Sequence, residues 1–489
     1  MNTRPSLRPF AAATALLGLV LAPATLLAQA KTGELTITSS SKPALALFQQ
    51  AREKMDNQET TAAAPLLDQA IHKDPDFAMA YAYRALAGGG FNVLRLNMDK
   101  AVALAPKVSP GERLWIQAQE AQFDGNLPKA KQQGDELLKL YPNDKRIAQL
   151  AGNFLGDSPA DLSAALRHYE KATAIDARYA SAYNQIGYAQ SRLGDYTKAE
   201  AAFKQYIALR PGSPNPYDSY AELLMKMGRY DDSIAQYEKA LEKDAQFSSA
   251  LAGIGHNDVF KGDYVKGRQS YQREFDQAPN VNGKTGSMFW TSTSFVHEGN
   301  VAEALNAIEQ ARVFAAKENL VPTVIATHEQ AAFILAETGD LAGSVKHNEA
   351  ASRLVEESSL PAATKEAARL RVMLARARIL TAVHEFDSAN VLVGKCRTMV
   401  DASRNPVEER ALQGVLGMLE LEQGHNDQAL AHFEKADPES AYDLFYTAVA
   451  QERKGDKVEA ARLYSKVSTW NQNDLGYAIV RARARAKKS

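Results

Sequence analysis

The chain has 489 residues, of which 45% are hydrophobic and 24% charged, and its formal net charge is −1. This composition excludes an intrinsically disordered chain, which would be poorer in apolar residues and further from neutrality. The balance of 57 Lys and Arg against 58 Asp and Glu argues against nucleic acid as a partner, because proteins that bind it normally carry a basic surplus.

The first thirty residues have the features of a secretory signal peptide. Two arginines precede an apolar run, Phe10 to Leu21, and the tripeptide that ends at Ala30 fits a small-x-small cleavage signal. We therefore expect cleavage after Ala30 and an exported protein, periplasmic or secreted. The run is shorter than the ~20 apolar residues of a membrane span. The sequence holds no other candidate, so we expect no transmembrane segment in the mature chain.

Three series of residues recur along the chain with one period of 34 residues, the first sign of a repeat architecture. The members are Gly194, Gly228 and Gly262; Tyr196, Tyr230 and Tyr264; and the aromatic residues Tyr169, Phe203, Tyr237 and Tyr271. Because the three series are independent, we interpret the period as structural.

The stretch from Ala180 to Ser213 illustrates one unit. Apolar and small residues from Tyr183 to Gln190 are spaced to form one helical face, and Gly187 within it lets a second helix approach closely. Gly194 suits the left-handed conformation that ends a helix, and Pro211 cannot continue one. The unit is therefore predicted to be a helix–turn–helix.

These positions resemble the signature of the tetratricopeptide-repeat (TPR) family. The matching residues are Tyr183-x-x-Ile186-Gly187, then Ala199-x-x-x-Phe203, then Pro211. The resemblance implies an all-α fold, a right-handed α-solenoid of stacked antiparallel helix pairs. It also implies that the first helix of each pair lines an extended concave face.

Along the chain, the repeat pattern varies in regularity. Residues 31–43, rich in Thr and Ser, are predicted to be a linker, and residues 44–282 an N-terminal TPR array with regular units over 146–281. Residues 283–470 are predicted to be divergent TPR-like repeats, because their turn markers recur at variable spacing. In all we expect eleven or twelve helix pairs.

The last segment, residues 471–489, carries alternating arginines and alanines between Arg481 and Arg485. We predict a capping helix with a solvated outer face, as a terminal repeat requires. The alternative is a weak contact with an anionic surface through residues 481–488.

Motifs for catalysis are scarce. Ala278 to Thr285 fits a relaxed phosphate-loop pattern, but it follows a repeat helix rather than a strand, so we interpret it as a connecting loop. The single cysteine, Cys396, is expected in a helix core, where it forms no disulfide. The histidines show no metal-ligand spacing. We therefore expect no catalytic residues, no metal and no cofactor.

The candidate binding residues are those of the first helices that should face the concave groove. They are Phe154, Asn184, Tyr188, Asp218, Glu222, Met225 and His256. Their mix of aromatic, acidic and amide side chains indicates a ligand of peptide length with positive charge, although each could also be an ordinary solvated groove residue. The cations with which some TPR proteins of the family grip a terminal carboxylate are absent from the matching positions.

Three functions remain open from the sequence. The favoured one is an exported scaffold or adaptor that binds proteins or peptides in its concave groove. The second is a structural component of an envelope export or polysaccharide assembly machine. The third is an enzyme with a site within residues 285–470, which would need a polar pocket that the sequence does not display. The resemblance supplies a class of function and leaves the partner unidentified.

Overall fold

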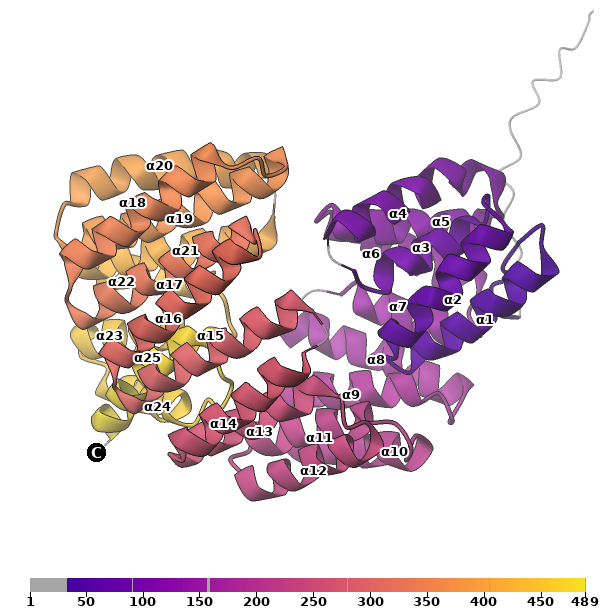
Figure 1. Ribbon diagram of the computed structural model, residues 1–489, viewed down its shortest axis with the longest axis horizontal. Helices are drawn as coiled ribbons and strands as arrows, with labels where there is room; N and C mark the ends of the chain where they lie inside the picture. Colours follow the sequence, from indigo (N-terminus) through magenta and orange to yellow (C-terminus); the bar gives the residue numbers. More distant parts are fainter. Residues whose placement is uncertain (1–32, 90, 156–158, 279, 404, 489) are drawn as a thin grey trace, which may run out of the picture.

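Antiparallel helix pairs follow one another along the computed structural model, which describes residues 33–89, 91–155, 159–278, 280–403 and 405–488 (Figure 1). This part of the chain contains twenty-five α-helices and one short 3-10 turn, so twelve pairs are followed by one terminal helix. The all-α solenoid is thus confirmed, with the larger of the two expected pair numbers. The predicted signal peptide and its cleavage point lie outside the described residues.

The first seven pairs contain mostly helices of three to four turns. Their bounds are α1 (Lys42–Asp56), α2 (Thr60–Lys73), α3 (Ala78–Leu86), α4 (Phe91–Leu104), η1 (Ala105–Lys107), α5 (Pro110–Phe123), α6 (Leu127–Leu140), α7 (Lys145–Asn153), α8 (Pro159–Ile175), α9 (Ala180–Arg192), α10 (Tyr196–Leu209), α11 (Asn215–Lys226), α12 (Tyr230–Lys243), α13 (Ser248–Lys261) and α14 (Tyr264–Gln277).

The divergent half continues the same stack with longer helices, which explains the wider spacing of its turns. Their bounds are α15 (Val281–Glu298), α16 (Val301–Lys317), α17 (Val321–Thr338), α18 (Leu341–Glu357), α19 (Ala362–Ala382), α20 (Phe386–Ser403), α21 (Pro406–Glu422), α22 (Asn426–Phe433), α23 (Ala441–Lys454), α24 (Lys457–Ser468) and α25 (Leu475–Lys488). Cys396 on α20 is fully buried, as predicted, and burial raises the pKa of its thiol to about 11.

A residue in the left-handed backbone conformation, with a positive φ angle, follows the first helix of most described pairs. Gly194 and Gly262 have φ angles of 83° and 92°, which glycine adopts without strain. Where the sequence lacks glycine, the same turn is made by Gln58 and His384, with φ angles of 62° and 58°. The turn geometry is therefore kept even in units that the sequence pattern marks poorly.

Neighbouring helices, both within a pair and between successive pairs, pack closely where a glycine faces an aromatic ring. A Cβ on Gly187 would lie 2.6 Å from the ring of Phe203, which confirms the close approach expected from the sequence. Gly253 is tighter still, because a Cβ there would lie 2.1 Å from the ring of Tyr237 in the preceding pair. These rings are buried and form much of the core between helices.

The segment expected to be a linker is held against the N-terminal pairs. Residues 34–39 are extended, and the backbone N–H of Leu35 donates to Asp144 at 2.7 Å. The backbone N–H of Thr38 donates to Glu112 at 2.8 Å. The backbone N–H of Ser40 donates in the same way to Asp74 at 2.9 Å, so the described part of this segment forms a strap across α5 and the N-terminus of α7.

The stacked pairs form an arc. The helices α1 to α6 lie on one side of Figure 1, the divergent half lies on the other, and the regular units join them below. A cavity of about 1490 Å³ separates the turn after α5 from the ends of α19 and α20. These two arms, α1 to α6 and the divergent half α15 to α25, therefore face one another across the concave side.

The terminal helix α25 lies inside this arc. It packs on α15, α23 and α24, and its residues Tyr477, Val480 and Ala484 are fully buried. The expected solvated cap is wrong in this respect, because Arg481 is only 4% exposed. An apolar stripe on α25 explains the placement, since it buries more surface within the arc than at an end of the stack.

Candidate functional site

The concave face is built from the first helices of the pairs, and the seven predicted groove residues are distributed unevenly on it. Asn184, Tyr188, Asp218 and Glu222 lie on the neighbouring helices α9 and α11, which contact each other along this side. Phe154 is not a groove residue, because α7 ends at Asn153 and the ring turns into the core against Gly134. That part of the prediction is wrong.

Met225 and His256 lie under another part of the chain. Met225 is 8% exposed and belongs to an apolar cluster that includes Phe260 and Tyr477. The ring of His256 packs against Trp290 with ring centroids 4.5 Å apart. Neither side chain is therefore a freely solvated groove residue.

The covering element is the irregular segment Trp470–Asp474, which precedes α25. Asn471 adopts a left-handed φ of 52°, a conformation that asparagine tolerates, and accepts a hydrogen bond of 2.8 Å from the hydroxyl of Tyr230. The amide of Asn473 lies 2.9 Å from His256 and 2.9 Å from His297. Two asparagines thus attach an irregular stretch of chain to the start of α12, to α13 and to the end of α15.

The two histidines bonded by Asn473 are neutral. His256 Nδ1 accepts from the amide of Asn473 and lies 2.8 Å from the hydroxyl of Tyr271, so it has no room for a proton. Burial lowers the pKa of His256 to about 3, and burial together with Arg481 lowers the pKa of His297 to about 3. The contact therefore depends on uncharged imidazoles.

The docking of this segment should weaken in acid. On release, both histidines regain the ability to bind protons below pH ~6.5, whereas Asp474, whose pKa burial raises to about 6, gives one up. The released form then binds about one proton more, so docking loses about 1.4 kcal/mol per pH unit as the pH falls below ~6. Hydrogen exchange of residues 470–485, corrected for intrinsic rates, should show less protection at pH 5 than at pH 7.

A double variant provides the control for this titration. Replacing both His256 and His297 by Gln keeps hydrogen-bonding groups but removes the histidine titration, so that only Asp474, with its raised pKa, still titrates, and the protection should then increase instead of decrease below pH ~6. Equal protection of the unsubstituted segment at both pH values would contradict the assignment.

The arginines of α25 take part in internal contacts. Arg481 donates to the backbone carbonyl of Phe260 at 2.8 Å, and its guanidinium lies 4.9 Å from the ring centroid of the same residue. Arg483 pairs with Glu337 at 2.7 Å, and Lys487 pairs with Glu452 at 2.9 Å. Arg481 is therefore buried away from any surface, whereas the anionic-surface contact through the other residues of 481–488 stays a prediction.

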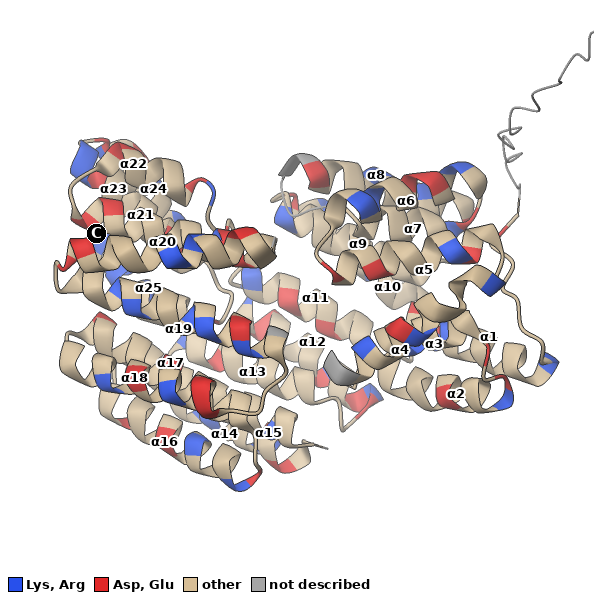
Figure 2. Cartoon of the chain, turned by 90° about the horizontal axis from the view of Figure 1, so that it is seen from above, with Lys and Arg blue, Asp and Glu red and all other residues tan. Residues whose placement is uncertain are grey.

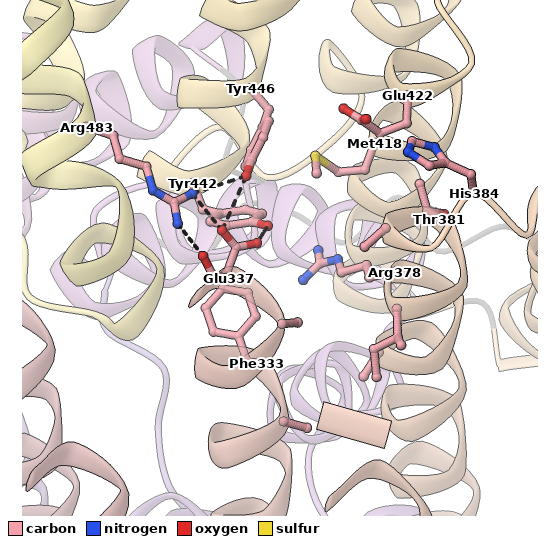
Figure 3. A pocket seen from close by; sticks show the side chains of 15 residues that line it. Phe333, Glu337, Arg378, Thr381, His384, Met418, Glu422, Tyr442, Tyr446 and Arg483 are labelled. Atoms are coloured by element: carbon pink, nitrogen blue, oxygen red, sulfur yellow. Dashed lines mark hydrogen bonds and ion pairs between the residues drawn. The ribbon is translucent and has the colours of Figure 1, made fainter. Parts of the chain in front are cut away.

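Glu337 forms one wall of a concave pocket of about 320 Å³ between α17, α19, α21, α23 and α25 (Figure 3). Its carboxylate accepts from Tyr442 at 2.5 Å, from Tyr446 at 3.3 Å and from Arg483. Figure 3 shows Arg378 opposite this group, and its guanidinium lies 5.5 Å from the ring centroid of Tyr442. The pocket lining is mostly apolar with a few polar groups, and Glu337 among them is fully engaged by the protein itself.

The open part of the concave face lies between α9 and α11. The Tyr188 hydroxyl donates to Glu222 at 2.6 Å and lies 3.1 Å from the Ser219 hydroxyl. Glu222 is exposed, whereas Asp218, one turn earlier on the same helix, is 8% exposed. Burial, with the nearby Glu222 carboxylate, raises the pKa of Asp218 well above its usual range. The two neighbouring carboxylates, Asp218 and Glu222, are therefore the part of the groove with an unfavourable electrostatic energy.

The structure shows where the phosphate-like sequence pattern lies. Residues 281–285 of the phosphate-like pattern form the first turn of α15, with Asn280 as its N-cap, rather than a longer connecting loop. The Lys284 ammonium lies 5.1 Å from the ring centroid of Phe275. None of the described helices combines the length and apolar character needed to cross a membrane.

Positively and negatively charged residues are interspersed along the described helices of both halves of the chain (Figure 2). This distribution agrees with the near-zero net charge and provides no continuous basic stripe in that view.

The sequence did not indicate Asn471, Asn473 or Glu337. The first two stand in a short polar stretch between helices, and Glu337 is one of many acidic residues on helices. Their partners lie far away in the sequence, so no local pattern marks them.

Comparison with solved structures returns helical repeat proteins. MamA aligns at 21% identity over 33% of this chain and 87% of its own, with a TM-score of 0.28. PilW, a widely conserved type IV pilus biogenesis factor, aligns at 18% identity over 50% of this chain and 99% of its own, with a TM-score of 0.31.

Curated relatives match short stretches. Superkiller complex protein 3 of Mus musculus is 30% identical over 21% of this chain, and the small glutamine-rich tetratricopeptide repeat-containing protein 2 of Mycosarcoma maydis is 28% identical over 17%. The chain spans 6% of the length of the first and 24% of the second.

Family models supply the remaining comparison. Tetratricopeptide-repeat models match residues 191–254 and, separately, residues 48–88, 160–214 and 415–473. The matches lie in both the regular and the divergent half, where the structure has the same helix pairs. Together with the period of 34 residues and the glycine–aromatic contacts, they identify the chain as a member of the tetratricopeptide-repeat family.

Proposed function

We propose that this protein is an exported scaffold that holds an extended segment of a partner protein on its concave face. The class, a protein-interaction scaffold, follows from the repeat family. Export is supported by the apolar run and cleavage signal near the start of the sequence. An N-terminus at Lys31 in the protein from an envelope fraction is the expected observation.

The observation that carries the proposal is the seating of Trp470–Asp474. This stretch has no regular secondary structure, yet Asn471 and Asn473 attach it to residues of the concave helices. This wall can therefore hold a chain segment without regular secondary structure through side-chain hydrogen bonds and aromatic packing. The open surface over α9 and α11 continues the same wall and offers comparable groups, among them Tyr188 and Glu222.

The second candidate, a structural component of an assembly machine, draws on the same surface. It differs in requiring a permanent partner, which would cover the concave face in every preparation. The cavity of about 1490 Å³ between the arms gives such a partner space. An enzyme remains the least supported alternative, because the pocket around Glu337 is engaged by the chain itself.

The test is selection of peptides of about twelve residues from a displayed library on the immobilised full chain, followed by fluorescence anisotropy. We expect selected peptides to lose at least about tenfold in affinity when Glu222→Trp fills the groove. Glu238→Trp is the matched control, because Glu238 is an exposed glutamate on the outer helix α12. Failure to select any peptide, or equal loss in both variants, would overturn the proposal.

A further inference from the structure

The repeat places four polar side chains opposite one another on α9 and α11. Asn184 and Asp218 are one repeat of 34 residues apart, and so are Tyr188 and Glu222. The hydrogen bond of 2.6 Å between Tyr188 and Glu222 shows that equivalent positions face each other across the two helices. Asn184 should therefore face Asp218 in the same way.

These groups leave several hydrogen-bond acceptors unused. Asn184 is 4% exposed, and its Oδ1 is buried without a hydrogen-bond partner. Within the described part of the chain, no ion pair involves Asp218 or Glu222, and Glu222 receives only the Tyr188 hydroxyl. A buried acceptor without a partner is costly, so the site is complete only when something supplies donors.

Other acids in this fold show what usually completes such a site. Asp56 pairs with Arg146 at 2.7 Å, and Glu337 pairs with Arg483 at 2.7 Å. Asp218 instead has another carboxylate, Glu222, one turn away, and burial together with that carboxylate raises the pKa of Asp218. Among the described residues, no Lys or Arg therefore forms an ion pair with either of these two neighbouring carboxylates.

We propose that Asn184, Asp218, Tyr188 and Glu222 form a seat for a lysine or arginine side chain of a bound extended peptide. An ammonium or guanidinium has donors and no acceptors, which complements this acceptor-rich set. Glu222, being exposed, meets the cation first, and Asp218 and Asn184 lie deeper. The proposal rests on the proposed function, because it identifies what the groove recognises.

The position of the seat relative to residues 470–474 supports a peptide, and not a free polyamine, as the source of the bound cation. Asn471 is attached at Tyr230, the first residue of α12, while the seat lies on α9 and α11 before that turn. A partner peptide can therefore enter the open end of the groove without displacing residues 470–474. A free polyamine has the same charged groups but lacks the backbone that the wall can hold.

The experiment uses the full chain and labelled peptides of about twelve residues with a Gly, Ser and Gln background. One peptide carries two lysines, a second carries two acetyl-lysines, and spermidine is the competitor without a backbone. We expect the lysine peptide to bind at least about tenfold more tightly than the acetylated one. Tighter binding of spermidine than of the lysine peptide would overturn the choice of a peptide.

Charge-removing variants locate the seat. Asp218→Asn and Glu222→Gln should each weaken the lysine peptide about tenfold or more, whereas Glu238→Gln on α12 should leave it unchanged. Without peptide, Asp218→Asn should raise the melting temperature, because it removes an unpaired buried charge. A lowered melting temperature would show that the carboxylate has a structural role and would overturn the assignment.

These experiments distinguish failure of the cation seat from failure of the proposed scaffold function. If library peptides without lysine or arginine bind the groove and respond to Glu222→Trp, the scaffold stands and the cation seat is overturned. If no peptide binds by either route, both fail.

Discussion

Replacing Tyr477 by alanine is expected to lower the free energy of unfolding of the divergent half by about 3–5 kcal/mol. Tyr477 is fully buried on α25, and its ring lies 5.8 Å from the ring centroids of both Phe260 and His297. Removing it leaves a cavity in an aromatic cluster that joins three separate helices, α13, α15 and α25.

The measurement is chemical denaturation followed by circular dichroism, with attention to the first transition. A repeat array need not unfold in one step, so the loss should appear as an earlier transition rather than a shift of the whole curve. Tyr477→Phe keeps the ring and serves as the control, with a change expected within about 0.5 kcal/mol. A small change in the alanine variant would mean that α25 is held mainly by its arginines.

The second large effect is expected at Gly253. A Cβ at this position would lie 2.1 Å from Cζ of the Tyr237 ring, closer than atoms can approach, so Gly253→Ala must displace a buried ring. Overpacking of this kind typically costs about 1–3 kcal/mol, and more where neither helix can move. Thermal unfolding should show a clear decrease in melting temperature.

A glycine in open space gives the matched comparison. Gly286 lies inside α15, and a Cβ there would meet nothing within 4 Å. Gly286→Ala should therefore stabilise the helix by about 0.5–1 kcal/mol, because alanine loses less backbone entropy than glycine. If both alanines had the same effect, the close packing of Gly253 against Tyr237 would not be the cause. Tyr237→Leu should partly restore the stability of Gly253→Ala, since it removes the colliding ring.

The fold was predictable because its contacts are local. The 34-residue period, the glycine turns and the meeting of Gly187 with Phe203 all involve residues within one or two helices of each other. Cys396 was predictable for the same reason. The sequence indicated that the spacing of the helix pairs varies in the divergent half. It did not indicate that longer helices cause this variation.

The site was only partly predictable. Asn184, Tyr188, Asp218 and Glu222 follow from repeat register, and the structure places them together on α9 and α11. Phe154 was misplaced because α7 stops after nine residues, one turn before the register would suggest. The cover over His256 depends on Asn473, whose partners are separated from it by 217 and 176 residues, and no periodicity carries that information.

The attachment of residues 470–485 to the middle of the chain also determines how the repeats respond to one another. An open solenoid behaves as a one-dimensional row in which each unit senses only its neighbours. Here the contact of Arg481 with Phe260 spans 221 residues and joins distant units into a loop. Closing so long a loop costs little more entropy than closing one of half the length. Local unfolding in the divergent repeats should therefore propagate to α11 and α13, whereas α1 to α6, outside the loop, should unfold independently.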